Sequence, residues 1–325
     1  MQAWLCETLD GIGAMKWQTL PTPEPLAGEV RIAIRAASLN FPDLLIVEGK
    51  YQFKPALPFV PGSEFSGVID AVGEGVQHLR VGQPVAAING SGGFATHACV
   101  KATQVLVLPT GFALEDGAAF AFTYGTSHHA LMDRAALQAG ETVLVLGAAG
   151  GVGSAAVQIA KAAGAKVIAA ASSDEKCALL SQLGADATLN YSTANIRERL
   201  KELTAGKGPD VVYDPVGGEL AEPVFRSIAW RGRYLVVGFA GGGIPALPWN
   251  LALLKGASIM GVFWGDFVKR EPQHFGAAMA QLMQWYAQGL VKPVIDRALP
   301  MSELAAAYAR MGTRQVKGKL LLLNN

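Results

Sequence analysis

The feature that most constrains the fold is a glycine-rich turn between an apolar strand and a helix. The segment Thr142–Lys176 reads TVLVLGAAGGVGSAAVQIAKAAGAKVIAAASSDEK. A Val- and Leu-rich strand pattern leads into the turn at residues 147–153, a helical run stops at Gly164, and a second apolar strand follows at Lys166–Ala171. A glycine cluster in this strand–turn–helix–strand order is typical of a dinucleotide-binding unit, whereas the same cluster alone is weak evidence.

The turn offers a physical route to a pyrophosphate. Gly150 has no Cβ, so the backbone can approach the phosphates, and Gly153 lets the helix pack close to the strand. The amides and the positive dipole end of the predicted Val152–Ala163 helix would hold the anion. Ala148 replaces the first glycine of the usual fingerprint, which alters the turn but leaves phosphate access open. The predicted contacts are Ala149, Gly150, Gly151, Val152 and Gly153; the alternative is a glycine-rich corner without a ligand.

The end of the second strand indicates which dinucleotide binds. An NAD site usually has Asp or Glu about 20 residues past the glycines, to bond the ribose 2′-hydroxyl. Here the strand ends Ala170-Ala171-Ser172-Ser173, Lys176 lies one helical turn further on, and Tyr191 ends the next short strand. Hydroxyls and a cation suit a 2′-phosphate, so the sequence predicts NADPH.

Two acids close to this strand end argue the other way. Asp174 and Glu175 follow the serines directly. Ser172 and Glu175 have the spacing of a capping box, and acids stabilise a helix N-terminus. We therefore interpret both acids as helix-starting residues.

Length and composition limit the remaining possibilities. A chain of 325 residues is long enough for two domains, each with its own core. The balance of 27 basic and 26 acidic residues gives no reason to expect nucleic acid or an acidic membrane as the main partner. Three widely spaced cysteines predict neither a disulfide framework nor a metal knot. With no signal-peptide pattern and no long uninterrupted apolar run, we expect a cytoplasmic protein.

The pattern of predicted elements divides the chain into three parts. The first 120 residues are β-rich and irregular, with strands expected at Val30–Ala36, Gly67–Val72, Pro84–Ile88, Phe94–Val100 and Gln104–Leu108. Strands then alternate with helices that often end at glycine, with strands expected at Thr142–Gly147, Lys166–Ala171, Ala187–Tyr191, Asp210–Asp214, Arg233–Gly238 and Ser258–Phe263. Helices at Gln273–Gln288 and Ser302–Met311 precede a terminal strand, Lys319–Leu323. The alternating part predicts an α/β fold with a doubly wound parallel sheet.

Several motifs in order along nearly the whole chain resemble one family. They are RAASLNFPDLLIVEGKY, LPFVPGSEFSGVIDAVGEGV, GTSHHAL, AAGGVGSAAVQIAK, DVVYDPVGG and the terminal GKLLL. The chain resembles a zinc-independent member of the medium-chain dehydrogenase/reductase superfamily, in its quinone oxidoreductase (zeta-crystallin-like) branch. The resemblance implies a GroES-like β-rich catalytic domain at 1–121, an NADP-binding Rossmann domain at 122–266 and a C-terminal segment at 267–325 that completes the first domain. It also implies a homodimer and an active site in the cleft between the domains.

Zinc is not expected. In the metal-dependent relatives Cys and His occupy the positions matched here by Asn40 and Ser63, and Glu64 alone cannot supply the roughly four ligands that zinc requires. The cysteine cluster of the structural zinc site is also missing, and the adjacent His128 and His129 would diverge on a helix. Without Lewis-acid help, the acceptor must already be electrophilic, as quinones and α,β-unsaturated carbonyls are.

By the same resemblance, catalytic roles are expected for Asn40, Tyr51 and Asp43. Asn40 would bond the acceptor oxygen or the nicotinamide ribose, and Tyr51 would donate a proton or form a pocket wall. The alternatives are ordinary turn chemistry for Asn40-Phe41-Pro42-Asp43 and a lid role for Tyr51. Further expected cofactor contacts are Thr123, Gly238, Phe239 and Arg314.

Three functions from different classes remain open. The first is an NADPH-dependent quinone reductase, and the second is an enoyl or enone reductase, including one acting on thioesters. The third is a non-catalytic NADPH-binding structural or RNA-binding protein. The near-neutral charge argues against RNA as its main ligand, because phosphate binding needs a basic surface. Trp249 and Trp264 are candidates for a substrate wall or, alternatively, for packing.

Overall fold

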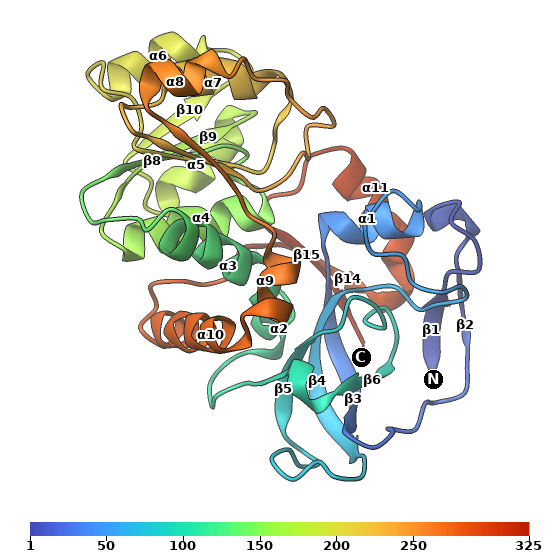
Figure 1. Ribbon diagram of the computed structural model, residues 1–325. Helices are drawn as coiled ribbons and strands as arrows, with labels where there is room; N and C mark the ends of the chain where they lie inside the picture. Colours follow the sequence, from blue (N-terminus) through green and yellow to red (C-terminus); the bar gives the residue numbers. More distant parts are fainter. Residues whose placement is uncertain (325) are drawn as a thin grey trace. The chain divides into compact units, whose positions relative to one another are not determined.

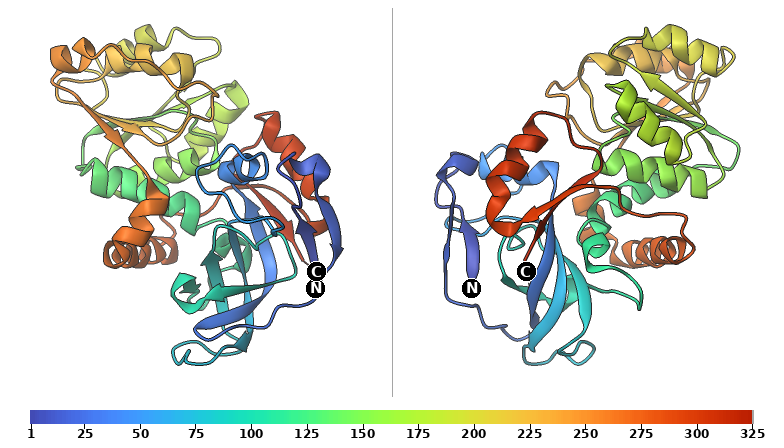
Figure 2. Two further views of the ribbon diagram at one scale, coloured as in Figure 1. Left: turned by 45° about the vertical axis from the view of Figure 1, so that its right-hand side comes forward. Right: turned by 180° about the vertical axis from the view of Figure 1, so that it is seen from behind.

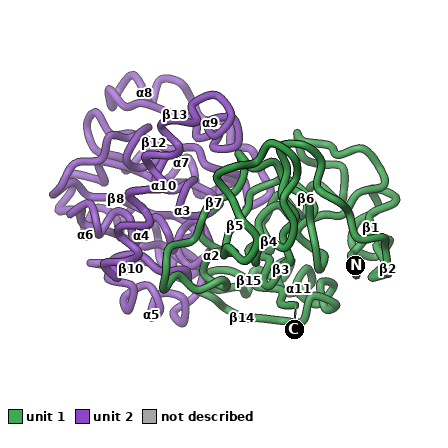
Figure 3. Tube along the Cα trace, turned by 90° about the horizontal axis from the view of Figure 1, so that it is seen from below, with its two compact units in different colours: residues 1–122, 295–325 green, residues 123–294 purple. Residues whose placement is uncertain are grey.

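The computed structural model describes residues 1–324, which form two compact units. Unit 1 comprises Met1–Phe122 and the segment from Ile295 to the C-terminus, and unit 2 comprises Thr123–Val294 (Figure 3). The boundary between the units after Phe122 lies within one residue of the expected boundary after residue 121. The other boundary lies after Val294 instead of after residue 266, so residues 267–294, expected in the C-terminal segment, belong to unit 2.

Side-chain hydrogen bonds explain why this segment stays with unit 2. Gln158 donates to the carbonyl of Lys292 at 3.0 Å and accepts from its N–H at 2.6 Å. His128 Nε2 lies 2.7 Å from Gln281 Oε1. These side-chain contacts are not visible in the order of strands and helices on which the predicted boundary rested.

Unit 2 has a six-stranded, all-parallel sheet in the order β10-β9-β8-β11-β12-β13. The strands are β8 (Thr142–Val145), β9 (Lys166–Ala171), β10 (Ala187–Asn190), β11 (Val211–Asp214), β12 (Arg233–Val236) and β13 (Ser258–Gly261). The helices are α3 (Ala121–His128, starting in unit 1), α4 (Gly151–Ala162), α5 (Asp174–Gln182), α6 (Ile196–Leu203), α7 (Ala221–Ser227), α8 (Asn250–Lys255), α9 (Trp264–Arg270) and α10 (Pro272–Ala287), with a π-helical turn at His129–Arg134.

Helices cover both faces of this sheet, as its apolar strands require. Figure 1 shows α6, α7 and α8 on one side and α3 and α4 on the other. The α6–α8 side forms a core in which strand residues such as Leu144 pack with Leu200 of α6 and Phe225 of α7. The predicted doubly wound sheet is confirmed.

Unit 1 is built on a seven-stranded, mostly antiparallel sheet. Its strands are β3 (Glu29–Leu39), β4 (Glu64–Val72), β5 (Pro84–Ile88), β6 (His97–Lys101), β7 (Val105–Val107), β14 (Ile295–Pro300) and β15 (Lys319–Leu323). A separate hairpin-like pair, β1 (Gln2–Leu5) and β2 (Lys16–Thr19), and the helices α1 (Phe41–Val47), α2 (Leu114–Gly117) and α11 (Leu304–Gly312) complete the unit. The C-terminal strand β15 pairs with β3, so a red strand from the end of the chain and a blue strand from its first 40 residues share one sheet (Figure 2).

The sequence did not predict β1, β2, β14 or α1 as regular elements. The segment Asn40–Asp43, for which turn chemistry was the alternative to a catalytic role, starts the helix α1. Asn40 is its N-cap, and Asp43 at the third helical position forms a capping box with it. A turn and a capped helix begin with the same polar residues, so the local sequence does not separate them.

Candidate cofactor and acceptor sites

The glycine turn of unit 2 has the geometry that a pyrophosphate needs. A Cβ on Gly153 would lie 2.3 Å from the Gly147 carbonyl oxygen and 2.7 Å from Ala148 Cα, so α4 can pack this close to the turn only with glycine there. A Cβ on Gly150 would meet only the Gly147 oxygen, at 3.4 Å. Packing therefore explains Gly153, whereas Gly150 leaves space at the helix start for a ligand.

The start of α4 also supplies hydrogen-bond donors. Gly150 is the N-cap and has no side chain to cap the helix. The first backbone bond of the helix runs from the N–H of Ser154 to the Gly150 carbonyl at 2.8 Å. The N–H groups of Gly151, Val152 and Gly153 precede it and, as in any helix, have no acceptor in the helix itself. Together with the helix dipole they form an anion site, which fits a dinucleotide pyrophosphate.

The end of β9 gathers a hydroxyl and a cation. Lys176 Nζ lies 3.4 Å from Ser172 Oγ, and the Tyr191 N–H, just after β10, donates to the Ala171 carbonyl at 3.0 Å. Tyr191 therefore lies at the same strand end as the serine. This arrangement fits a ribose 2′-phosphate.

The helix cap at this point differs from the prediction. Ser173, not Ser172, is the N-cap of α5, and its hydroxyl accepts from the Lys176 N–H at 3.3 Å. The capping-box assignment to Ser172 and Glu175 is thus wrong. Asp174 accepts a hydrogen bond from Asn190 Nδ2 at 2.7 Å. With capping done by its neighbour, the Ser172 hydroxyl remains beside the Lys176 ammonium.

Three expected cofactor contacts, Thr123, Gly238 and Phe239, lie in unit 2. Thr123 is buried. The Gly238 N–H donates to the Asp214 carbonyl at 3.3 Å. The Phe239 ring packs directly on Gly217, since a Cβ on that glycine would lie only 2.8 Å from the ring. Their contacts with a nicotinamide stay a prediction.

Asp214 is a structural residue that the sequence reasoning missed. It ends β11 and is buried. Its Oδ1 accepts from the N–H groups of Val216 and Gly217, both at 2.8 Å, and its Oδ2 accepts from the Tyr234 hydroxyl at 2.5 Å. One carboxylate thus shapes the loop that supports Phe239. An Asp at a strand end followed by Pro-Val-Gly-Gly is the signal that could have identified it.

The two candidate tryptophans have different environments. Trp264 is buried, and its ring centroid lies 6.0 Å from that of Phe275. The Trp264 ring also packs so closely on Gly125 that a Cβ there would lie 2.7 Å from it. Trp264 is therefore a packing residue of unit 2. Trp249 is 85% exposed at the start of α8, so it does not line an enclosed pocket of this unit.

Unit 1 contains a buried polar cluster around the N-terminus of α1. Its members come from β3, α1, the residue before β4, β4 and β15: Ser38, Asn40, Asp43, Ser63, Glu64 and Lys319. Strand register brings them together, because Ser38 pairs with Glu64 and the pairing of Leu320 with Leu39 places Lys319 beside Asn40. The predicted residues Asn40 and Asp43 thus lie in one cluster, and Lys319 and Ser38 are members that sequence reasoning missed.

Both carboxylate oxygens of Asp43 accept hydrogen bonds within this cluster. Its Oδ2 accepts from the Asn40 N–H at 2.8 Å, and its Oδ1 accepts from the Ser63 N–H at 3.1 Å and the Ser63 hydroxyl at 2.5 Å. Burial raises the pKa of Asp43 to about 6, although these hydrogen bonds oppose the shift. The carboxyl therefore holds the Asn40 backbone in place, and the catalytic role expected for Asp43 stays a prediction.

Glu64 and Lys319 form the charged centre of the cluster. Lys319 Nζ donates to Asn40 Oδ1 at 2.5 Å and to Glu64 Oε2 at 3.3 Å, and both charged side chains are nearly inaccessible. Ser38 Oγ and Asn40 Nδ2 also donate to Glu64 Oε2, and the Phe122 N–H donates to its Oε1 at 2.8 Å. Burial lowers the pKa of Lys319, and the charge of Glu64 opposes that shift.

This donor set does not suit zinc. Among Asn40, Ser63 and Glu64 only Glu64 carries a charged ligand atom, and its carboxylate is bound to the Lys319 ammonium group. A metal cation beside Nζ would be repelled by it. In residues 1–324 no group of three or more His, Cys, Asp or Glu side chains is placed to hold a metal ion.

Tyr51 and Arg314 also belong to unit 1 but lie outside this hydrogen-bonded cluster. Tyr51 is half-buried against the hydrophobic core, and burial, with the nearby Asp43 charge, raises the pKa of its phenol. Arg314 is exposed just after α11 with φ 57°. Both assignments stay predictions.

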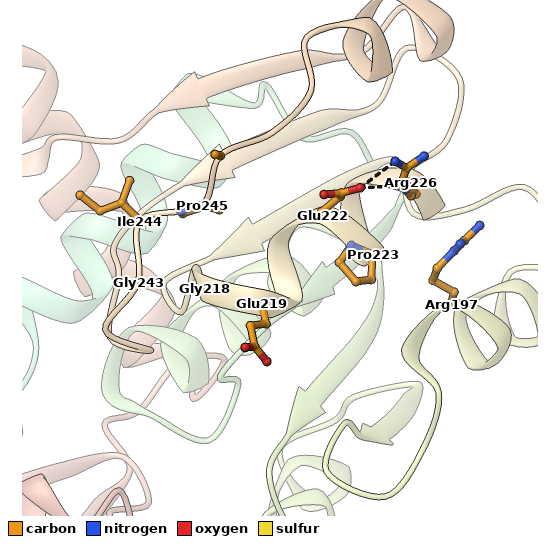
Figure 4. Close-up of a pocket in the computed structure, with 10 residues that line it drawn as sticks. Arg197, Gly218, Glu219, Glu222, Pro223, Arg226, Gly243, Ile244 and Pro245 are labelled. Atoms are coloured by element: carbon orange, nitrogen blue, oxygen red, sulfur yellow. Dashed lines mark hydrogen bonds and ion pairs between the residues drawn. The ribbon is translucent and has the colours of Figure 1, made fainter.

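The hollow shown in Figure 4 is a different feature of unit 2. It is lined by charged and apolar residues that include Arg197, Glu222, Arg226, Gly243 and Ile244. Arg226 and Glu222 pair at 2.6 Å, so much of its charge is neutralised internally. None of the candidate cofactor residues lines this hollow, and we do not assign the cofactor to it. Within the described chain, no helix combines the length and hydropathy needed to cross a membrane.

Comparisons with known proteins agree with this geometry. Residues 26–110 match the family described as alcohol dehydrogenase GroES-like domain, and residues 151–285 match the family described as zinc-binding dehydrogenase. The chain is 37% identical to quinone oxidoreductase-like protein 2 of Bos taurus, covering 99% of this chain and 96% of that protein.

Solved structures share the whole fold. Escherichia coli quinone oxidoreductase complexed with NADPH has a TM-score of 0.92 at 26% identity, with 100% of each chain covered. CurK enoyl reductase has a TM-score of 0.89 at 28% identity, covering 99% of this chain and 98% of that one. This chain therefore belongs to the quinone oxidoreductase branch of the medium-chain dehydrogenase/reductase family, with a GroES-like unit and a Rossmann unit.

Proposed function

We propose that this protein is an NADPH-dependent oxidoreductase that transfers hydride to quinones or related α,β-unsaturated carbonyl compounds. The observation that carries the proposal is the pairing of the Ser172 hydroxyl with the Lys176 ammonium at the end of β9, one strand away from the glycine turn. A hydroxyl and a cation at this place fit the 2′-phosphate that distinguishes NADPH from NADH. The NADPH complex of the related Escherichia coli enzyme supports the assignment.

Each candidate residue has a defined task in this proposal. Bound NADPH supplies the hydride. The N–H groups at the start of α4 hold its pyrophosphate, and Lys176 with Ser172 holds the 2′-phosphate. Asn40 donates a side-chain N–H to the acceptor oxygen, where negative charge develops as the hydride arrives. Tyr51, or water, returns the proton.

The direct test is an acceptor screen. NADPH oxidation is measured with 1,4-benzoquinone and with crotonyl thioester, each against NADH as the control cofactor. The proposal predicts NADPH-dependent turnover of the quinone. Reduction of neither acceptor, with NADPH still bound, would instead support the non-catalytic reading.

The second candidate is an enoyl reductase. The similarity to CurK enoyl reductase favours it, because that chain shares the complete fold. Both reactions deliver hydride to an electron-poor carbon conjugated with a carbonyl, so the same donors could serve either. Faster turnover of the thioester than of the quinone in the same screen would decide for this candidate.

We also propose that the protein forms a homodimer through unit 2. Strand β13 is the edge of its sheet, and an unpaired edge is a ready site for strand addition. Exposed apolar side chains lie on this strand and on the segments before and after it: Ile244, Trp249, Leu253, Leu254, Ile259 and Phe263. A second copy would cover them by a two-fold contact. Sedimentation of the wild type should give a dimer and Ile259→Lys a monomer; equal masses would contradict this interface.

A further inference from the structure

The side chain of Lys319 is buried without a solvent-exposed partner. Its side chain is 4% exposed, and the two residues that accept from it, Asn40 and Glu64, are buried. Burying a charge in this way is costly unless hydrogen bonds and an opposite charge compensate it. The three residues come from three separate parts of unit 1, so the fold converges on this contact.

The contact fixes the orientation of the Asn40 amide. An ammonium group can only donate, so the amide oxygen must face Lys319. Glu64, which only accepts when ionised, lies 3.3 Å from Asn40 Nδ2 on the other side. Turning the amide over would set its NH2 group against the ammonium and its oxygen against the carboxylate. Lys319 and Glu64 therefore allow one orientation only.

In this fixed orientation the Asn40 side-chain amide has one N–H donor that is not used by Glu64. Nδ2 carries two N–H bonds. In residues 1–324 Nδ2 is placed to donate to one acceptor, Glu64 Oε2. The Asn40 backbone N–H is already used by Asp43. The second side-chain N–H is thus the group that Asn40 can offer to an acceptor molecule.

We propose that Lys319 is a positioning residue: its ammonium binds Asn40 Oδ1 and Glu64 Oε2, and it thereby aims the free Asn40 N–H at the acceptor oxygen. This inference rests on the proposed function for the identity of the acceptor. Lys319 itself touches neither substrate nor cofactor in this proposal and acts through Asn40.

A double-mutant cycle tests this dependence. Asn40→Ala and Lys319→Met should each lower kcat with benzoquinone by about 100-fold, the loss typical of one misplaced donor to a developing oxyanion. The double variant should be no slower than Asn40→Ala, because Lys319 has nothing left to orient. NADPH affinity should be unchanged in Lys319→Met. Multiplied losses in the double variant would show that Lys319 acts independently of Asn40 and would overturn the proposal.

A second variant keeps the test valid if Lys319→Met fails to fold. Lys319→Met leaves Glu64 as an uncompensated buried charge, whereas Lys319→Met/Glu64→Gln removes both charges. We expect this pair to regain thermal stability without regaining kcat. Recovery of both together would mean that Lys319 is only structural. Lys161→Met, which removes a surface ion pair with Asp186 in unit 2, is the matched control and should keep wild-type kcat.

A spectroscopic readout separates this inference from the proposed function. The side-chain amide signal of Asn40 in a ¹H–¹⁵N spectrum, assigned by its loss in Asn40→Ala, should shift strongly in the Lys319→Met/Glu64→Gln variant and not in Lys161→Met. An unchanged signal would refute the positioning role. A shifted signal in a protein that reduces no acceptor would refute the proposed function alone.

Discussion

Replacing Lys176 by alanine should weaken NADPH binding selectively. The ammonium lies 3.4 Å from the Ser172 hydroxyl, and the two would clamp the same phosphate. A charge-assisted hydrogen bond contributes about 1.5–3 kcal/mol. Because Lys176 is half-buried and partly screened by water, the lower part of this range applies. About 1.5–2 kcal/mol corresponds to a roughly 10- to 30-fold higher Kd for NADPH.

The assay is a titration of each cofactor, followed by calorimetry or by quenching of protein fluorescence. NADH has no 2′-phosphate, so its Kd should change little in Lys176→Ala. Lys161→Ala is the matched control, since Lys161 also lies in unit 2 but pairs with Asp186 at 2.8 Å. Equal losses for NADPH and NADH would refute the 2′-phosphate assignment.

Two further perturbations follow from the same geometry. Gly150→Ala should leave thermal stability nearly unchanged yet abolish measurable NADPH binding. Gly153→Ala should lower thermal stability as well, because its Cβ would lie 2.3 Å from the Gly147 carbonyl oxygen. Equal melting temperatures for the two variants would contradict this. Asp43 has its folded pKa raised to about 6 from 3.8, so the stability that it contributes is fully present below the unfolded pKa and is lost as pH rises through about 6. Relative to Asp43→Asn, the wild type should therefore lose up to about 3 kcal/mol of unfolding free energy between about pH 4 and pH 7, measured by urea denaturation. The same pH dependence of the unfolding free energy in wild type and Asp43→Asn would disprove the shift.

The fold was largely predictable because its signals are local. The apolar runs at β9 and β15 matched the predicted ranges residue for residue, since buried strands bounded by glycine or charge have clear ends. The strand β14 was not predicted, because its sequence IDRALP has two charged residues and no apolar alternation. Its pairing with β15 depends on tertiary contact that no local pattern shows.

The candidate site was predictable only in part. The glycines, Ser172 and Lys176 follow from the strand–turn–helix pattern, since a phosphate site is built from contiguous chain. Lys319 could not be found in this way, because it lies 279 residues from Asn40 and has the pattern of an ordinary lysine at the start of a terminal strand. Only the antiparallel pairing of β15 with β3 brings the two side chains together.

The central claim is that NADPH reduces an electrophilic acceptor here without a metal ion. The most direct measurement is the rate of NADPH oxidation by 1,4-benzoquinone before and after exhaustive dialysis against a strong chelator. We predict equal rates in the two preparations, because the acceptor is already electrophilic and the polar donors of the site, not a metal ion, stabilise its developing charge. A rate that falls on dialysis and returns with added zinc would contradict the account.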